Sequence, residues 1–262
     1  MNNKTLFDGV VSKYDKYRPN YCNELFEDII TFSKLSKNMN VLEIGCGTGQ
    51  ATRSFLENGC YVNAVELGVE LVAYTQAKYK DFDRFSVECC SFEDFETSTE
   101  SYDLIYSATA FHWIEPRLGY AKLYSLLKSG GALALFWNRP MVSNENNQLF
   151  EEIQSIYMKH IPTWKRMSYS LELKYGECLT WMKEYHFEDI NSKQYKGKRS
   201  FDSDEYIQLL DTYSDHLALD ENVRTQLYSD IAGVIRRHNN KIMIDDYIEL
   251  YLAKKPSLGS LY

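Results

Sequence analysis

The segment from Val41 to Gln50 constrains the fold of this chain more than any other part of the sequence. It reads Val-Leu-Glu-Ile-Gly-Cys-Gly-Thr-Gly-Gln, so an apolar run leads into glycines at alternate positions. Glycine adopts positive φ and has no Cβ to hold a ligand away from the backbone, so this pattern predicts a buried strand, a ligand-binding loop and then a helix. The third glycine of the dinucleotide fingerprint G-x-G-x-x-G is absent, and no Lys-Ser/Thr pair follows as in a phosphate-binding loop.

Two carboxylates accompany this loop. Glu43 lies near the end of the first strand, where it would repel a pyrophosphate and would suit a cationic ammonium or sulfonium. Glu66 ends the next strand, close to the spacing at which an acidic side chain meets ribose hydroxyls in such folds. A carboxylate can accept from both hydroxyls of an unphosphorylated ribose. The sequence therefore indicates an adenosyl ligand and disfavours NADP.

Strand and helix signals alternate through the first half of the chain. Strands are expected at 41–44, 61–65, 85–87, 102–107 and 132–137, and helices at 21–35, 50–58, 69–80 and 118–127. This alternation predicts parallel strands joined by right-handed crossovers, and the later strands are apolar nearly throughout, as when helices cover both faces. The expected fold is an α/β, doubly wound (Rossmann-like), mostly parallel seven-stranded sheet.

The second half of the chain follows a different pattern. From 145 to about 185 it is rich in aromatic residues and reads as helical, which we interpret as an insertion covering the carboxyl edge of the sheet. The remaining elements are expected as strands near 190–196 and 242–253 and helices near 203–213 and 221–237. Because no linker or repeat is visible, residues 1–262 are expected to form a single domain with a helical cap inserted at about 140–188.

Composition restricts the partners and the location. A net charge of -8 and a pI near 5.3 disfavour nucleic acid, and the basic stretch Lys193–Arg199 is interpreted as an exposed edge. The six cysteines form no Cys-x-x-Cys pair, so no disulfide framework, zinc site or other metal site is expected. No apolar run is long enough for a membrane span and the start lacks a secretory leader, so a cytoplasmic location is expected. Monomer and homodimer remain equally open.

From Phe7 to about Trp137 the chain resembles the class I S-adenosylmethionine-dependent methyltransferases. The glycine motif, Glu66, the acidic turn 91–94 and the segments 102–105 and 127–131 occur in that family's order and spacing. The resemblance implies S-adenosylmethionine as the cofactor. The cofactor-binding residues it implies are Glu43, Gly45, Cys46, Gly47 and Gly49 for the methionine part, Glu66 and Leu67 for the ribose, Phe92 and Glu93 beside the adenine, and Thr109 and Ala110 near the sulfur.

A narrower similarity is to the small-molecule (type 11) group that includes trans-aconitate methyltransferase. The N-terminal pattern Phe7…Tyr14…Tyr17-Arg18-Pro19…Tyr21 is similar to that group's signature, and so is Ala110-Phe111-His112-Trp113-Ile114 after the fourth strand. One departure is Cys22, near which a second proline is often seen in that group.

The substrate side is predicted from position and chemistry. His112 follows the fourth strand at the edge where open α/β sheets bind ligands, so it could donate to a substrate carboxylate or act as a general base. Its alternative is a histidine bonded within the loop, with Trp113 in the core. Arg18 could pair with a carboxylate or be an ordinary surface arginine, and Tyr14 could cover the cofactor or simply pack. His112 is thus the candidate catalytic residue, and Tyr14, Arg18, His112 and Trp113 are the candidate substrate-binding residues.

Three functions fit these residues. The leading one is O-methylation of a small carboxylic acid, because an ionised carboxylate needs no base and the protein mainly positions the reactants. The second is C-methylation of a quinone-like or other enolisable molecule, for which His112 would be the base. The third is a non-catalytic module that binds S-adenosylmethionine. A NAD dehydrogenase ranks last, and the 140–200 region has no pattern that identifies the acceptor.

Overall fold

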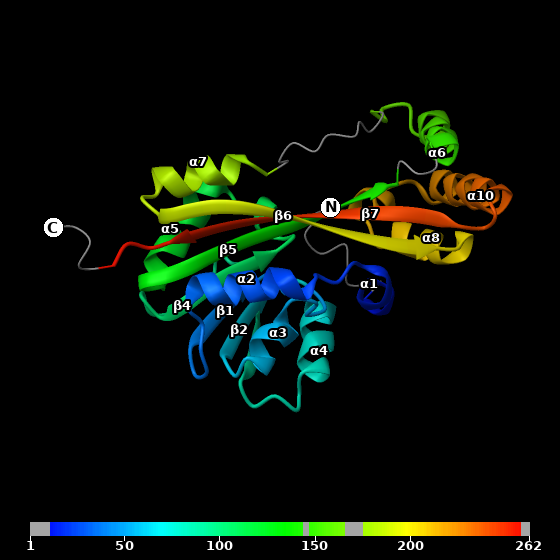
Figure 1. Ribbon diagram of the computed structural model, residues 1–262. Helices are drawn as coiled ribbons and strands as arrows, with labels where there is room; N and C mark the ends of the chain where they lie inside the picture. Colours follow the sequence, from blue (N-terminus) through cyan, green and yellow to red (C-terminus); the bar gives the residue numbers. More distant parts are fainter. Residues whose placement is uncertain (1–10, 144–146, 166–174, 258–262) are drawn as a thin grey trace. The chain divides into compact units, whose positions relative to one another are not determined.

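The computed structural model describes residues 11–143, 147–165 and 175–257 (Figure 1). The strands are β1 (Asn40–Ile44), β2 (Tyr61–Glu66), β3 (Phe85–Cys89), β4 (Tyr102–Ala108), β5 (Leu127–Val142), β6 (Glu188–Phe201) and β7 (Ile242–Lys254). The helices are α1 (Val11–Tyr17), α2 (Asn23–Ser33), α3 (Thr52–Glu57), α4 (Val69–Lys78), the 3-10 helix η3 (Phe111–Trp113), α5 (Pro116–Leu126), α6 (Asn147–His160), α7 (Glu177–Glu184), α8 (Ser203–Leu210), α9 (Ser214–Leu217) and α10 (Glu221–Arg237).

The seven strands form one sheet in the order β3-β2-β1-β4-β5-β7-β6. β1 pairs in parallel with β2 on one side and with β4 on the other, and the β2–β3 and β4–β5 pairs are also parallel. The strand order therefore reverses at β1, and in such sheets the crevice at the carboxyl ends beside the reversal is where ligands bind. The predicted doubly wound, mostly parallel fold is confirmed.

The chain divides into two compact units, each assembled from three stretches. Unit 1 comprises the described residues of Met1–Pro19, Arg139–Glu172 and Lys196–Tyr247, and unit 2 those of Asn20–Asn138, Leu173–Tyr195 and Ile248–Tyr262. The segment expected as one helical insertion is divided between them, since α6 belongs to unit 1 and α7 to unit 2. Within that segment, 144–146 and 166–174 lie outside the described residues.

Unit 2 has an apolar layer on each face of its strands. Val41 of β1 belongs to the layer under α2 and α3, and the next residue, Leu42, belongs to the layer under α5 and α7. Figure 1 shows α2 and α3 over the strands on their side. Phe55 of α3 and Leu123 of α5 are fully buried in these two layers. Burial on both faces is why the strands read as continuous apolar runs in the sequence.

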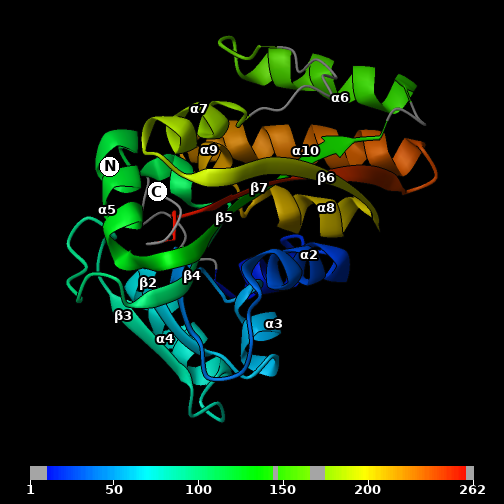
Figure 2. The ribbon, with the colours of Figure 1, turned by 60° about the vertical axis from the view of Figure 1, so that its left-hand side comes forward.

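Unit 1 has its own core, in which α6, α8 and α10 pack together. α6 supplies Phe150, Ile153 and Tyr157, whose spacing places them on one helical face. Ile231 and Ile235 of α10 lie opposite, and both are fully buried. Figures 1 and 2 show α6 beside α10. The apolar stripe that predicted α6 is therefore the stripe that packs.

A buried ion pair joins three segments of unit 1. Arg199 of β6 donates from Nε and Nη2 to the Asp246 carboxylate of β7, the latter contact measuring 2.9 Å. Its Nη1 donates to the carbonyl oxygen of Tyr17 at the end of α1, also at 2.9 Å. The Asp246 side chain is 6% exposed, so this fork of charge-assisted hydrogen bonds lies largely outside water.

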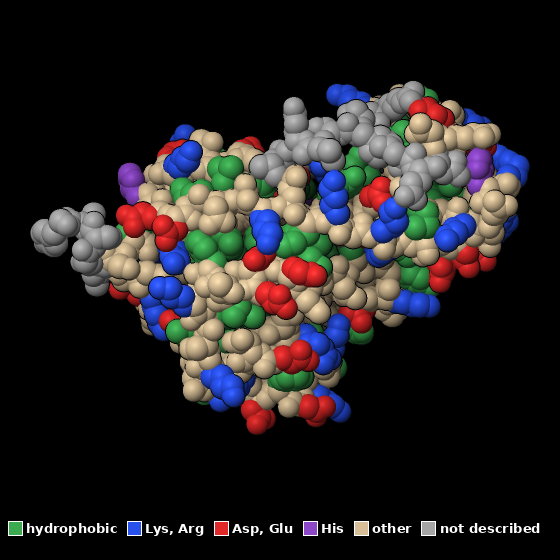
Figure 3. All heavy atoms as spheres, viewed as in Figure 1, with side chains coloured by type: hydrophobic (Ala, Val, Ile, Leu, Met, Phe, Trp, Pro, Cys, Tyr) green, Lys and Arg blue, Asp and Glu red, His purple; other side chains and the backbone are tan. Residues whose placement is uncertain are grey.

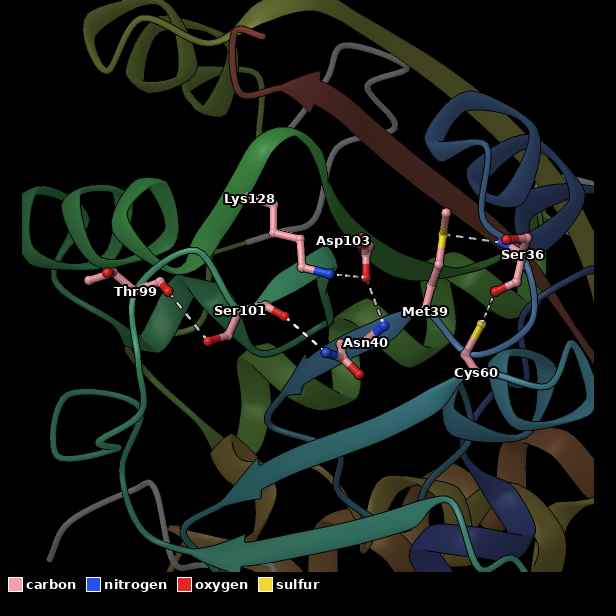
Figure 4. Close-up of polar contacts among 8 residues, drawn as sticks. All are labelled: Ser36, Met39, Asn40, Cys60, Thr99, Ser101, Asp103 and Lys128. Carbon is pink, nitrogen blue, oxygen red and sulfur yellow. Dashed lines mark hydrogen bonds and ion pairs between the residues drawn. The ribbon is translucent and has the colours of Figure 1, made fainter. Parts of the chain in front are cut away.

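The amino ends of β1, β4 and β5 are held by polar contacts (Figure 4). Asp103 accepts from the backbone N–H of Asn40 and from Nζ of Lys128, both at 2.8 Å. The side-chain amide of Asn40 donates to the carbonyl oxygen of Ser101 at 3.2 Å. These contacts fix one edge of the sheet and leave the opposite, carboxyl edge to the loops described next.

β5 differs from its prediction at its beginning. The sequence placed its start after Gly130, whereas β5 already begins at Leu127. Leu127 pairs with Tyr102 and Ala132 pairs with Leu104, so the register shifts between the two pairs. Gly130 lies in this irregular stretch with φ +75°. The glycine permits a bulge within the strand, where the sequence suggested a turn before it.

No helix among the described residues is long and apolar enough to cross a membrane.

Candidate active site

The glycine loop follows β1 at the carboxyl edge of the sheet. Gly45, Gly47 and Gly49 all have positive φ, at 69°, 56° and 77°. A Cβ on Gly45 would lie 2.5 Å from Cβ of Ala110, and one on Gly49 would lie 2.5 Å from a ring carbon of Tyr79. The loop is therefore pressed against the turn after β4 on one side and the end of α4 on another. A side chain at Gly45 would push the loop away from Ala110, and one at Gly49 would push it away from Tyr79.

Glu66 binds the backbone of this loop. Its Oε2 accepts from the N–H of Gly47 and its Oε1 from the N–H of Gly68, both at 2.9 Å. The residue is 9% exposed. The carboxylate thus faces the loop and the start of α4 rather than bulk water.

Glu43 lies fully buried behind the loop. Its Oε2 accepts from Oγ1 of Thr52 at 2.6 Å, and its Oε1 has no hydrogen-bond partner among the described residues. Burial raises the pKa of Glu43 to about 7, and the negative charge of Glu66 adds to this rise, against the hydrogen bond from Thr52. A buried carboxylate with an unpartnered oxygen fits a positive group bound at the loop.

The sequence did not identify the side chains of α4 that hold the loop from outside. Thr75 Oγ1 donates to the carbonyl oxygen of Gly47 at 2.6 Å, and Lys78 Nζ donates to that of Thr48 at 2.9 Å. The hydroxyl of Tyr79 donates to the Gly49 carbonyl oxygen at 2.6 Å. The i, i+3, i+4 spacing of these three residues shows that they share a helix face. Only the structure shows that this face meets the loop.

The turn after β3 contains Phe92 and Glu93. Phe92 is buried at 3% exposure and belongs to the core layer under α5. Glu93 is partly buried, and its carbonyl oxygen accepts from Nζ of Lys122 at 2.9 Å. Two other predicted cofactor residues are Cys46 and Leu67. Cys46 is buried in the loop, and burial raises the pKa of its thiol well above the ordinary value. Leu67 is half-buried directly after β2.

His112 lies in η3 and is held by Trp137. Trp137 Nε1 donates to Nδ1 of His112 over 3.0 Å. Trp137 is 1% exposed and stacks on Tyr175 with 4.4 Å between ring centroids. The His112 ring is inclined to those of Trp113 and Tyr175, at 5.0 and 5.9 Å. Because an indole N–H only donates, Nδ1 is the acceptor and the neutral imidazole carries its proton on Nε2.

The alternative interpretation, in which Trp113 is a core residue, is wrong, since Trp113 is 37% exposed; its substrate-binding role stays a prediction. It is Trp137, on β5, that takes the buried position beside His112. The sequence indicated His112 by its position after β4. It did not indicate that the hydrogen-bond partner would be Trp137, which lies on β5.

Tyr14 and Arg18 belong to unit 1. The Arg18 guanidinium lies over the ring of Tyr14 at 4.8 Å and over that of Tyr213 at 4.2 Å, and its Nη2 donates to the carbonyl oxygen of Thr212 at 2.6 Å. These contacts fasten α1 to the turn between α8 and α9. Phe7, from the same N-terminal pattern, lies outside the described residues.

The structure thus gathers most of the predicted site in unit 2: the glycine loop, both carboxylates, the turn after β4 and His112. Within residues 11–143, 147–165 and 175–257, no three His, Cys, Asp or Glu side chains form a group that could hold a metal ion. Metal independence stays a prediction.

Comparison with known proteins identifies a methyltransferase domain in the chain. A family described as a methyltransferase domain matches residues 41–131. An uncharacterized methyltransferase of Schizosaccharomyces pombe is 26% identical over 231 residues, which cover 84% of this chain and 87% of that protein. A malonyl-[acyl-carrier protein] O-methyltransferase of Paenibacillus sp. is 30% identical over 51% of this chain and 52% of its own length.

The fold is shared with solved methyltransferase structures. A protein of Anaeromyxobacter dehalogenans assigned to the type II methyltransferases has a TM-score of 0.68 at 18% identity, covering 92% of this chain and 99% of its own. Phosphoethanolamine N-methyltransferase 2 of Haemonchus contortus, solved with S-adenosylhomocysteine, has a TM-score of 0.58 at 18% identity, covering 98% of this chain and 61% of its own. Residues 41–131 thus form a methyltransferase domain, the relatives named above are methyltransferases, and the fold is that of solved methyltransferases, which together support an enzyme that uses S-adenosylmethionine.

Proposed function

We propose that this enzyme transfers a methyl group to the carboxylate of a small molecule and so forms a methyl ester. The observation that carries the proposal is the hydrogen bond from Trp137 to Nδ1 of His112. It leaves the proton of the neutral imidazole on Nε2, so His112 is a hydrogen-bond donor at that nitrogen and not a base. A donor suits an ionised carboxylate, whereas an enolisable carbon acid needs a proton acceptor.

The relatives support the same chemistry. Several are malonyl-[acyl-carrier protein] O-methyltransferases, and a malonyl group ends in a carboxylate. A methyl ester is the product of O-methylation at such a group. The proposal concerns the atom that is methylated, a carboxylate oxygen, and does not name the acid that carries it.

The residues around the glycine loop fit the cofactor. Glu66 accepts from the backbone N–H groups of Gly47 and Gly68, which holds its carboxylate beside the loop, where we propose that it binds the ribose hydroxyls. Glu43 would be ionised by a positive group bound at Gly45–Gly49. When bound, S-adenosylmethionine supplies the electrophilic methyl group and its thioether leaving group. Thr109 and Ala110, directly after β4, are proposed to face the reacting end of the cofactor.

A small-molecule acceptor is proposed rather than a nucleic acid. The chain carries a net charge of -8. On the described part of the face in Figure 3, acidic and basic side chains are interspersed and no continuous basic area is seen. Similarity to the trans-aconitate methyltransferase group, a substrate role for Tyr14, Arg18 and Trp113, and a cytoplasmic location remain predictions.

The test uses two substitutions at His112 that separate a donor from a base. Gln places an N–H near the position of Nε2 but cannot act as a base, and Ala provides neither. With a panel of small carboxylic acids, we expect H112A to lower kcat/KM about 100-fold and H112Q to keep activity within about tenfold of wild type. Products are identified by mass spectrometry as methyl esters. If H112Q is as inactive as H112A, the donor role of His112 is wrong, and a product with a new carbon–carbon bond would show C-methylation instead of ester formation.

A further inference from the structure

Thr109 adopts a backbone conformation that its side chain disfavours. It directly follows β4 and has φ +57°. Eight described non-glycine residues have positive φ, and Thr109 is the β-branched one among them. Most of the others are Asn, Asp or His, which tolerate this region. Such a conformation persists only where surrounding contacts hold it.

Three contacts hold Thr109, and all lie within unit 2. Its backbone N–H donates to the carbonyl oxygen of Phe136 at 2.8 Å. Its Oγ1 accepts from the backbone N–H of Asn138 at 3.2 Å and shares a hydrogen bond with the hydroxyl of Tyr21 at 2.8 Å. Two of these contacts come from β5, the strand adjacent to β4. The third comes from Tyr21, 88 positions away in the sequence.

Tyr21 contributes its ring and its hydroxyl to different contacts. The ring packs edge-on against Phe136, with 4.8 Å between centroids, and against Phe26 of α2 at 6.3 Å. The hydroxyl bonds to Thr109. Replacement by phenylalanine therefore removes the hydrogen bond and preserves the packing.

The turn after β4, formed by Thr109 and Ala110, is in contact with the glycine loop. Ala110 follows Thr109, and its Cβ lies 2.5 Å from the position that a Cβ on Gly45 would occupy. Any shift of the turn therefore moves one wall of the loop. The hydroxyl of Tyr21, the strained Thr109, Ala110 and Gly45 form a continuous series of contacts.

We infer that Tyr21 is a positioning residue for cofactor binding, which acts by holding Thr109 in its strained conformation so that the turn keeps the glycine loop in shape. The inference rests on the cofactor-facing role proposed for Thr109 and Ala110. Each contact in the series is between described residues of unit 2.

The experiment is a double-mutant cycle read by titration calorimetry with S-adenosylhomocysteine. Y21F should weaken binding about tenfold, because the loss of one hydrogen bond lets the turn relax. T109G removes both the hydroxyl and the strain, since glycine adopts positive φ freely. In the T109G background, Y21F should therefore change the affinity less than about twofold, the non-additivity expected of residues in contact.

The matched control is Y185F. The hydroxyl of Tyr185 donates to the carbonyl oxygen of Arg117 at 2.8 Å on the exposed surface, and its loss should leave the affinity unchanged. Equal binding by Y21F and wild type, or an equal effect of Y21F in both backgrounds, would overturn the inference. Because the readout is cofactor binding, these outcomes are independent of whether the wild type methylates an acid.

Discussion

Glu43 and Glu66 both stand at the ends of neighbouring parallel strands, yet their surroundings differ. Glu66 is bound by two backbone N–H groups, whereas Glu43 is fully buried and accepts from the side-chain hydroxyl of Thr52. The sequence predicted the position of both, because the apolar run before each marks a strand end. It could not predict their different environments, since these depend on α3 and α4 packing over the loop.

The raised pKa of Glu43 predicts how cofactor binding depends on pH. In the ligand-free protein the pKa is about 7, so below that pH the carboxyl is mostly protonated. A bound cation favours the ionised form, and binding must then release a proton. The affinity for S-adenosylmethionine should rise about tenfold from pH 6 to pH 8, most of it below pH 7, and then level off.

Calorimetry at several pH values, in buffers of different ionisation enthalpy, measures this dependence and the proton released. E43Q should remove the dependence of the affinity on pH. E57Q changes an exposed carboxyl of α3, 59% exposed, and should retain it. An unchanged slope in E43Q would assign the titration to another group.

At the scale of elements, β1, β2 and β4 were predicted close to their bounds, whereas the exposed β6 was predicted only in part and α1 not at all. β1, β2 and β4 read clearly because apolar residues run through them. β6 extends from Glu188 to Phe201, twice as far as expected from 190–196, because most of its side chains are exposed and carry no apolar pattern. α1 was not expected at all, and it contains no buried residue. Hydrophobic periodicity signals burial, so elements without it remain hidden.

The capping box of α8 has a measurable contribution to stability. Asp202 accepts from the N–H of Glu205 at 2.8 Å, and the Glu205 carboxylate accepts from the N–H of Asp202 at 3.2 Å. D202A should lower the free energy of unfolding by about 1 kcal/mol in urea titrations, because one helix N–H loses its acceptor. E57A breaks an exposed pair with Arg53 and should cost less than about 0.5 kcal/mol. Equal losses would refute a special role for the cap.

At the scale of the whole chain, unit 2 was largely predicted and unit 1 was not. Most of unit 2 is one stretch, 20–138, in which β1, β2 and β4 are each followed by a helix before the next strand. Unit 1 combines Met1–Pro19, Arg139–Glu172 and Lys196–Tyr247. Local patterns reveal helices but not which distant segments pack together. The sequence therefore indicated α6, α8 and α10 without indicating that they share a core.

The pair Arg199–Asp246 should matter for unit 1 because it connects such distant segments. D246N removes the charge that balances Arg199, whose side chain is 23% exposed. We expect a loss of about 3 kcal/mol in the free energy of unfolding. D245N affects the adjacent, more exposed pair with Lys198, at 3.9 Å, and should cost less than about 1 kcal/mol. Similar losses from both variants would contradict the importance of the buried pair.

The central place of β7 in the strand order has a consequence for protein synthesis. β7 lies between β5 and β6, yet it follows both of them in the chain. Until residues 242–254 emerge, β6 has no neighbour to join it to the sheet, and both units lack part of their chain. A nascent chain halted before Ile242 would expose unpaired edges of β5 and β6, so the sheet is completed only after residues 242–254 have been made.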